Sequence, residues 1–120
     1  MNNLSGIEVT LDIFSGRPNP HWTLSEEQVN DLQTRLRTLP EASPVAPPGL
    51  GYRGFLVTNP GNDDRLPSQL RAFASVIAIT TGQATNSYQD ANNIEGWFID
   101  QARERGYGEV IDLFRRTDLQ

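Results

Sequence analysis

The chain has 120 residues, of which 37% are hydrophobic and 21% charged, and it carries a net charge of −5 with no cysteine and no lysine. This length and mixture predict a single globular domain over residues 1–120. An acidic chain repels phosphate backbones and anionic membranes, so we expect neither nucleic acid nor a membrane as a partner. The missing residue types exclude thiol nucleophiles, cysteine metal sites and Schiff-base chemistry.

Residues 7–14 alternate apolar and polar side chains, which predicts a strand with one buried and one solvated face. Its polar positions, Glu8, Thr10 and Asp12, are expected to line a shallow cleft. The strand ends at residues 15–20, where a glycine and two prolines are typical of a turn.

A helix is predicted to begin after Ser25 and to end at Pro40. Ser25 as N-cap and Gln28 three residues later form the pattern of a capping box. The apolar side chains of this segment recur at helical spacing and form one stripe (Val29, Leu32, Leu36 and Leu39).

The middle of the chain predicts a proline-rich loop over residues 41–51, a second strand over 52–58 and a turn over 59–64. Residues 66–81 fit either a helix or a strand. Their β-branched side chains favour a buried strand that begins near Ala72 and ends at Gly82.

Residues 83–93 are polar and show no clear periodicity. A second helix is predicted over residues 94–105, capped by Asn92 or Asn93 and followed by Gly106 as its C′ residue. A short last helix follows near Val110. The expected order is β-α-β-β-α-α, which predicts an α+β fold with a small three-stranded, mostly antiparallel sheet and helices packed on one face.

The loop from Gly16 to Trp22 is the leading candidate site. Its two X-Pro bonds restrict Arg17 and Asn19 to extended geometry, so the loop is stiff before anything binds. Arg17 can clamp a carboxylate or a phosphate, and His21 is the one side chain that titrates near neutral pH. The competing interpretation is a simple turn, in which Trp22 covers the core and Arg17 pairs with Asp12 or Asp90.

Three functions are compatible with these residues. The first is a binding domain for a small polar ligand, either an organic molecule or a carbohydrate. Its amide, imidazole, indole and guanidinium groups would contact the ligand. The predicted ligand-binding residues are Arg17, Asn19, His21, Trp22 and Arg53.

The second function is an enzyme without a cofactor, such as a cyclase, an isomerase or a lyase. His21 would act as general acid or base, oriented by Asp12 or Asp90, with Arg17 stabilising an anion and Tyr88 relaying a proton. The third is an acidic interaction or inhibitor protein, with a basic protein or a second copy of this chain as its partner.

The run Asn62-Asp63-Asp64 is rich in oxygen ligands, but it lacks the alternating spacing of a calcium loop, so a plain turn is predicted and no metal is expected. The first residues show neither a basic region nor an apolar stretch. We therefore expect no signal peptide and a cytoplasmic location.

Overall fold

The structure is a computed structural model that describes residues 4–13, 18–49 and 51–118, with side chains as far as Leu113. Arg17 lies outside the described residues. The described elements, in chain order, are β1 (Leu4–Leu11), β2 (His21–Ser25), α1 (Glu26–Arg35), β3 (Phe55–Thr58), β4 (Gln69–Phe73), β5 (Val76–Thr81), β6 (Ala84–Gln89), α2 (Ile94–Glu104) and α3 (Gly108–Asp118).

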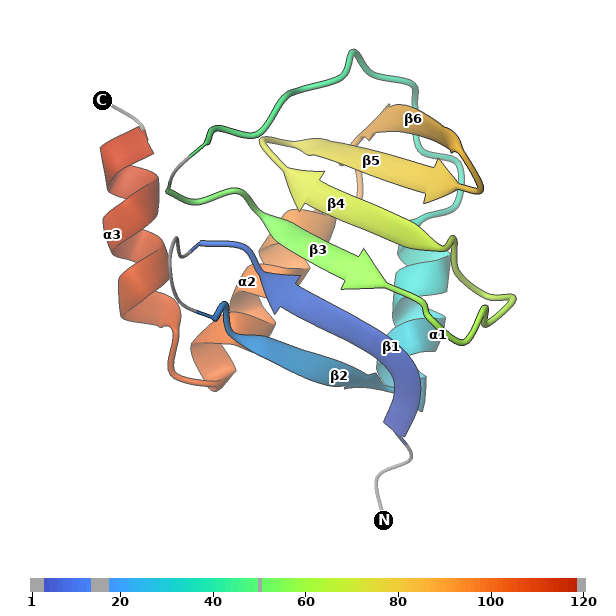
Figure 1. Cartoon of the computed structure of the whole chain (residues 1–120), viewed down its shortest axis with the longest axis horizontal. Coiled ribbons are helices and arrows are strands. Elements are labelled where there is room, and N and C mark those ends of the chain that lie inside the picture. The colour runs from blue at the N-terminus through green and yellow to red at the C-terminus, as the bar shows by residue number, and fades with distance from the viewer. Residues whose placement is uncertain (1–3, 14–17, 50, 119–120) are drawn as a thin grey trace.

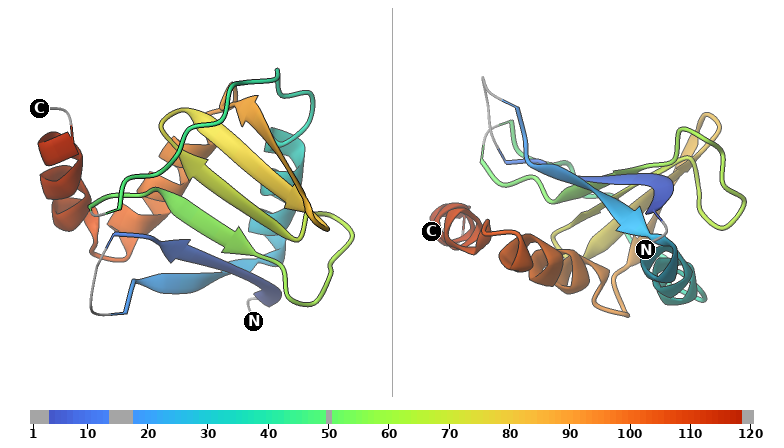
Figure 2. Two further views of the ribbon diagram at one scale, coloured as in Figure 1. Left: turned by 45° about the horizontal axis from the view of Figure 1, so that its top comes forward. Right: turned by 90° about the horizontal axis from the view of Figure 1, so that it is seen from below.

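The six strands form one antiparallel sheet in the spatial order β2-β1-β3-β4-β5-β6. Helices α1 and α2 lie against the same face of this sheet, and α3 lies beside α2 at one end of it (Figures 1 and 2). The opposite face, called the outer face below, carries no helix among the described residues.

The core lies between the sheet and the helices. The predicted alternation of β1 is confirmed, because Ile7, Val9 and Leu11 are buried while Glu8 is exposed. Burying these side chains removes a large apolar area from water, which is the main force that holds the two layers together. The largest fully buried side chains come from both layers (Ile7, Leu11, Leu24, Phe55, Leu70 and Ile77 from the strands, and Leu32, Ile94 and Phe98 from the helices).

The predicted three-stranded sheet is wrong, although the α+β class is confirmed. Residues 21–25 form β2 directly before α1. Residues 69–81 form a hairpin, because the chain reverses at Ala74 and Ser75. Residues 84–89 form β6, whose side chains are mostly exposed, so no apolar alternation marked it as a strand.

The first helix is capped as predicted. The Ser25 side chain accepts a hydrogen bond from the Gln28 amide, and the Gln28 side chain accepts one from the Ser25 amide. The regular helix ends at Arg35, before Pro40.

Asn93 holds the N-cap position of the second helix, as predicted, but its side chain makes no capping bond, and the Asn92 side chain donates to the Arg35 carbonyl. The Asp90 carboxylate accepts from the amides of Ile94 and Glu95, at 2.6 and 2.8 Å. Asp90 therefore satisfies the free amides at the start of α2.

One edge of the sheet is closed by the chain itself. The Gln89 amide donates to the Pro40 carbonyl and the Ala42 amide donates to the Ser87 carbonyl, at 2.7 and 3.0 Å. The segment between α1 and β3 therefore runs along β6 before it returns to the middle of the sheet (Figure 2). This contact protects an edge strand that would otherwise expose unpaired backbone groups.

Candidate functional site

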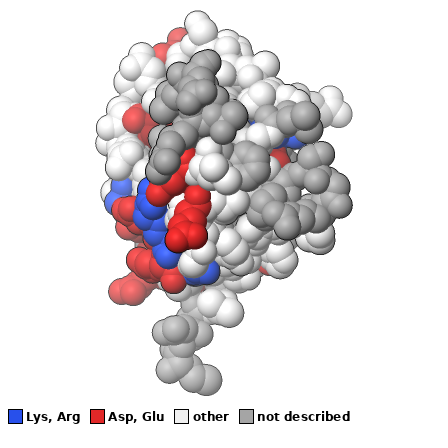
Figure 3. Space-filling model, turned by 90° about the vertical axis from the view of Figure 1, so that its left-hand side faces the viewer, with Lys and Arg blue, Asp and Glu red and all other residues white. Residues whose placement is uncertain are grey.

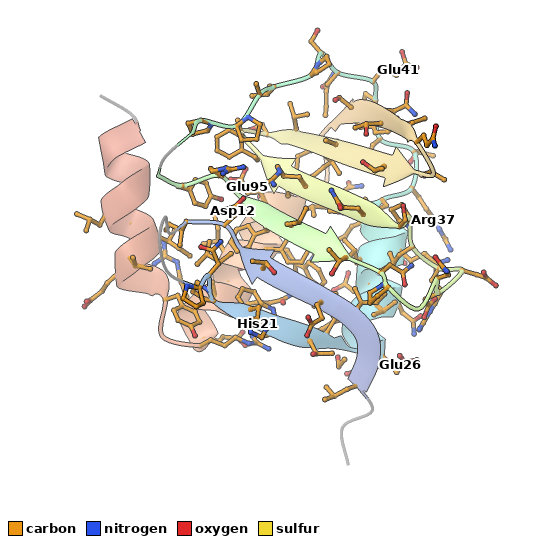
Figure 4. The ribbon with its side chains drawn as sticks, in the orientation of Figure 1. Asp12, His21, Glu26, Arg37, Glu41 and Glu95 are labelled. Carbon is orange, nitrogen blue, oxygen red and sulfur yellow. The ribbon has the colours of Figure 1, made fainter. Side chains whose placement is uncertain are left out.

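Charged side chains meet on the outer face of the sheet where β1 ends. Asp12 follows the buried Leu11, and Arg71 lies between the buried Leu70 and Ala72, so both point away from the helices. Arg53 precedes β3, and Asn19 precedes β2. We call Asp12, Asn19, Arg53 and Arg71 the Asp12 cluster, and Figure 4 labels Asp12 at the end of β1.

The Asp12 carboxylate is the centre of this cluster. Arg71 Nη1 donates to Asp12 Oδ2 at 2.8 Å and to the Arg53 carbonyl at 2.9 Å. The Asn19 side chain donates a longer bond to Asp12 Oδ1 at 3.4 Å and accepts one from the Ile13 amide at 3.0 Å. Asn19 thereby ties the connector between β1 and β2 to the end of β1.

The backbone brings Arg53 to Asp12 through an unusual conformation at Gly54. The Arg53 amide donates to the Asp12 carbonyl, and the Asp12 amide donates to the Gly54 carbonyl, at 2.8 and 3.0 Å. Gly54 has a φ of +84°, and a Cβ at this position would lie 2.1 Å from the Ala72 carbonyl oxygen. Only glycine fits here without displacing β4.

Arg53 is the member of the cluster that the described residues do not satisfy. Its Nε lies 3.5 Å from Asp12 Oδ2, close enough for an ion pair, yet it is buried and makes no hydrogen bond to any described residue. The Arg53 side chain is 36% exposed, against 15% for Asp12 and 21% for Arg71. Its guanidinium is therefore open to solvent and is not committed to a hydrogen-bond acceptor among the described residues.

His21 and Trp22 lie on opposite faces of β2. His21 pairs with Thr10 in the register, so it lies on the outer face of the strand next to Asp12, and its side chain is exposed (Figure 4). Trp22 is 7% exposed, and its indole Nε1 donates to Gln101 of α2 at 2.8 Å. Trp22 is thus part of the core, as the competing interpretation of the loop predicts.

Two predicted catalytic residues lie far from His21. Tyr88 is on β6, at the opposite edge of the sheet, and it pairs with the buried Ile77 on the helix-covered face. The Asp90 carboxylate accepts hydrogen bonds from the first backbone amides of α2. The structure therefore does not bring His21, Tyr88 and Asp90 together.

Tyr88 instead borders an apolar groove of about 230 Å³ between the end of α1 and β5. The other described residues of this groove are Leu36, Thr38, Leu39 and Ile79.

A larger cleft of about 400 Å³ lies beside the first turns of α2. Three of the four charged side chains that line it are bound within the chain: Tyr52 donates to Glu95 at 2.5 Å, Asp90 caps α2, and Arg103 pairs with Asp112 of α3. The hydrogen bonds that Arg103 donates to Asp112 raise the pKa of Arg103 above its ordinary value. The described residues that line the cleft are Ser75, Asp90, Asn93, Glu95, Gly96, Ile99, Asp100 and Arg103.

The side of the molecule where α3 lies shows acidic and basic side chains next to each other (Figure 3). No group of three or more histidine or acidic side chains that could hold a metal ion occurs within the described ranges. In the same part of the chain, no helix is both long and apolar enough to cross a membrane.

The sequence analysis named Asp12, Asn19 and Arg53, which the fold does bring together, but it missed Arg71. Arg71 is flanked by the buried Leu70 and Ala72, and this alternation was the available signal. The signal was hidden because residues 66–81 also fit a helix, and the favoured strand was expected to begin only near Ala72.

The comparisons with known proteins add no assignment. No protein-family model, no curated protein and no solved structure matches this chain. The case for a function therefore depends on the geometry of the site.

Proposed function

We propose that this chain is a binding domain for a small polar ligand and that the Asp12 cluster is the binding site. The observation that carries the proposal is the state of Arg53. Its side chain is partly exposed beside the Asp12 carboxylate, and its buried Nε has no hydrogen-bond partner among the described residues. Buried donors in folded proteins nearly always have an acceptor, and Arg53 has only the long contact to Asp12, so its exposed end is available to a ligand.

The groups of the cluster suit a ligand with several polar atoms. Arg53 supplies donors only, Asp12 supplies acceptors only, and the Asn19 amide supplies both. A ligand hydroxyl can accept from a guanidinium and donate to a carboxylate at the same time. Hydroxyl-bearing organic molecules, including carbohydrates, therefore match the cluster better than apolar ones.

The site is held by stiff parts of the chain. Asp12 directly follows β1 and Arg71 lies in the middle of β4, and Pro18 and Pro20 restrict the backbone on both sides of Asn19. Binding to such a site orders few additional torsions, which favours affinity.

The geometry gives less support to the other two functions. The enzymatic function places Tyr88 near His21, with Asp12 or Asp90 orienting the imidazole, but Tyr88 lies at the other edge and on the other face of the sheet. The interaction function needs an acidic surface, and the α3 side does not provide one, because acidic and basic side chains lie next to each other there (Figure 3).

The test is a titration of the isotope-labelled protein with small neutral and charged molecules, followed by the backbone amide signals. We expect the amides of Ile13, Arg53 and Gly54 to shift in a saturable way. Asp12→Asn removes the acceptor carboxylate, and we expect it to weaken the binding of neutral hydroxyl-bearing probes about tenfold or more, because hydrogen bonds to charged groups are the strong ones.

Asp31→Asn is the matched control, because it removes the same charge from an exposed ion pair on α1. It should leave the affinity unchanged. If no probe of any class moves the cluster amides, or if both variants weaken binding equally, the cluster is not the binding site.

A further inference from the structure

We infer that the ligand of the Asp12 cluster carries a carboxylate group, which Arg53 binds. This inference rests on the proposed function and names the chemical class of the ligand. It follows from the charge balance within the cluster and from the side of Arg53 that remains open.

The charges of the cluster do not cancel. Asp12 and Arg71 form a direct ion pair at 2.8 Å, and Asn19 makes a further, longer contact with the same carboxylate. The net charge of the Asp12–Arg71 pair is therefore close to zero. Arg53 adds a second positive charge, so the cluster has an excess of one cation within a chain whose net charge is −5.

Within the described chain, Asp12 is the acidic side chain that pairs with Arg53, and that contact is long. The 3.5 Å separation between Arg53 Nε and Asp12 Oδ2 is beyond a strong charge-assisted hydrogen bond, which spans about 2.7–2.9 Å. Asp12 covers the Nε side of the guanidinium. The terminal nitrogens therefore form the side from which an anion approaches.

The planar guanidinium and the nearby Asp12 select a carboxylate over a phosphate. A guanidinium can donate two parallel hydrogen bonds to the two oxygens of a planar carboxylate. Phosphate accepts such bonds too, but at neutral pH a phosphate monoester carries nearly two negative charges. Repulsion from Asp12 and attraction to the two arginines both scale with that charge, whereas the cost of removing an anion from water grows as the square of its charge. The single excess positive charge of the cluster is therefore matched by a carboxylate, and a phosphate is disfavoured.

Three probes that share one sugar ring separate these chemistries: D-glucose is neutral, D-glucuronate carries a carboxylate and glucose 6-phosphate carries a phosphate. Acetate and benzoate serve as carboxylates without the ring. The titrations are followed by the Nε–H signal of Arg53 and by the cluster amides, at constant ionic strength because salt screens charge contacts. We expect glucuronate to bind at least tenfold more tightly than glucose and glucose 6-phosphate.

Three arginine variants test whether the preference for the carboxylate depends on Arg53. Arg53→Gln should remove the preference for glucuronate over glucose, whereas Arg37→Gln should retain it. Arg37 is exposed and follows α1, and its substitution removes the same charge as Arg53→Gln (Figure 4). Arg53→Lys should recover only part of the preference, because an ammonium group lacks the planar pair of donors.

The outcomes separate this inference from the proposed function. If glucose or glucose 6-phosphate binds the cluster as tightly as glucuronate, the carboxylate assignment is wrong while the site remains a polar-ligand site. If the carboxylates leave the Arg53 signals unchanged, the assignment is also wrong. The proposed function itself fails only when neutral and charged probes alike leave the cluster amides unmoved.

Discussion

Gly54 shows how a single residue positions the candidate site. Its φ of +84° turns the backbone so that Arg53 bonds to Asp12 while Phe55 enters β3. A side chain would be strained by this φ and would also collide with the Ala72 carbonyl. The residue is therefore needed for the strand pairing and for the cluster at once.

We expect Gly54→Ala to lower the free energy of unfolding by about 2 kcal/mol or more, from backbone strain and steric overlap. Urea denaturation measures this change. Gly61→Ala is the control, because a Cβ at Gly61 meets no atom within 4 Å. Equal effects of the two substitutions would show that the Gly54 conformation is not required.

Asp63 and Arg65 form a second charged contact, remote from the site. Arg65 donates to the Asp63 carboxylate at 2.6 Å and also pairs with Glu26 of α1, which links the turn after β3 to that helix. The hydrogen bonds from Arg65 lower the pKa of Asp63 to about 2, from an ordinary value of 3.8.

This shift fixes the direction of a pH effect. A carboxyl with a lowered pKa stabilises the folded state above its ordinary pKa, and the contribution is lost as the pH falls toward about 2. We expect Asp63→Asn to lose less stability than the natural chain when acidified over this window. Unfolding curves at several pH values test it, and identical pH dependence in both proteins would contradict it.

At the scale of elements, the sequence was informative where a segment has one buried face or a cap. β1 alternates because one face packs on the helices, and α1 begins at a capping box, so both were predictable. β2 was missed because its five residues run directly into the N-cap of α1. β6 was missed because an edge strand with mostly exposed side chains carries no apolar period.

The β4–β5 hairpin was missed for a different reason. Its two turn residues, Ala74 and Ser75, both have positive φ, at 54° and 65°. Such turns usually contain Asn-Gly or Asp-Gly, so Ala-Ser between an aromatic residue, Phe73, and a β-branched one, Val76, is typical of a continuous strand instead. Because the turn was misplaced, Arg71, one of the four residues of the Asp12 cluster, was not identified from the sequence.

The same turn offers a stabilising change. Ala74→Asn with Ser75→Gly should raise the free energy of unfolding by about 1–2 kcal/mol, because both residues tolerate positive φ better than those present. Thermal or urea unfolding measures the gain. Ser87→Gly, within β6, should instead cost about 0.5–1 kcal/mol. Destabilisation by the double substitution would contradict the turn geometry described above.

At the scale of the whole molecule, the arrangement of layers explains which predicted site residues meet. The helices cover one face of the sheet, and strand order separates β2 from β6 by four strands. Asp12, Asn19 and Arg53 meet because β1 and β3 are neighbours. Tyr88 and Asp90 do not join these residues, because the sheet has six strands and β6 lies at its other edge. The three-stranded sheet expected from the sequence could not show this separation.

The most direct test of the central claim is crystallographic screening of the protein with small polar fragments that bear carboxylate or hydroxyl groups. We predict that bound fragments gather at the Asp12 cluster, with a fragment oxygen within hydrogen-bond distance of the Arg53 guanidinium. Fragments that occupy the cleft beside α2 while Arg53 stays uncontacted in every crystal would contradict the account.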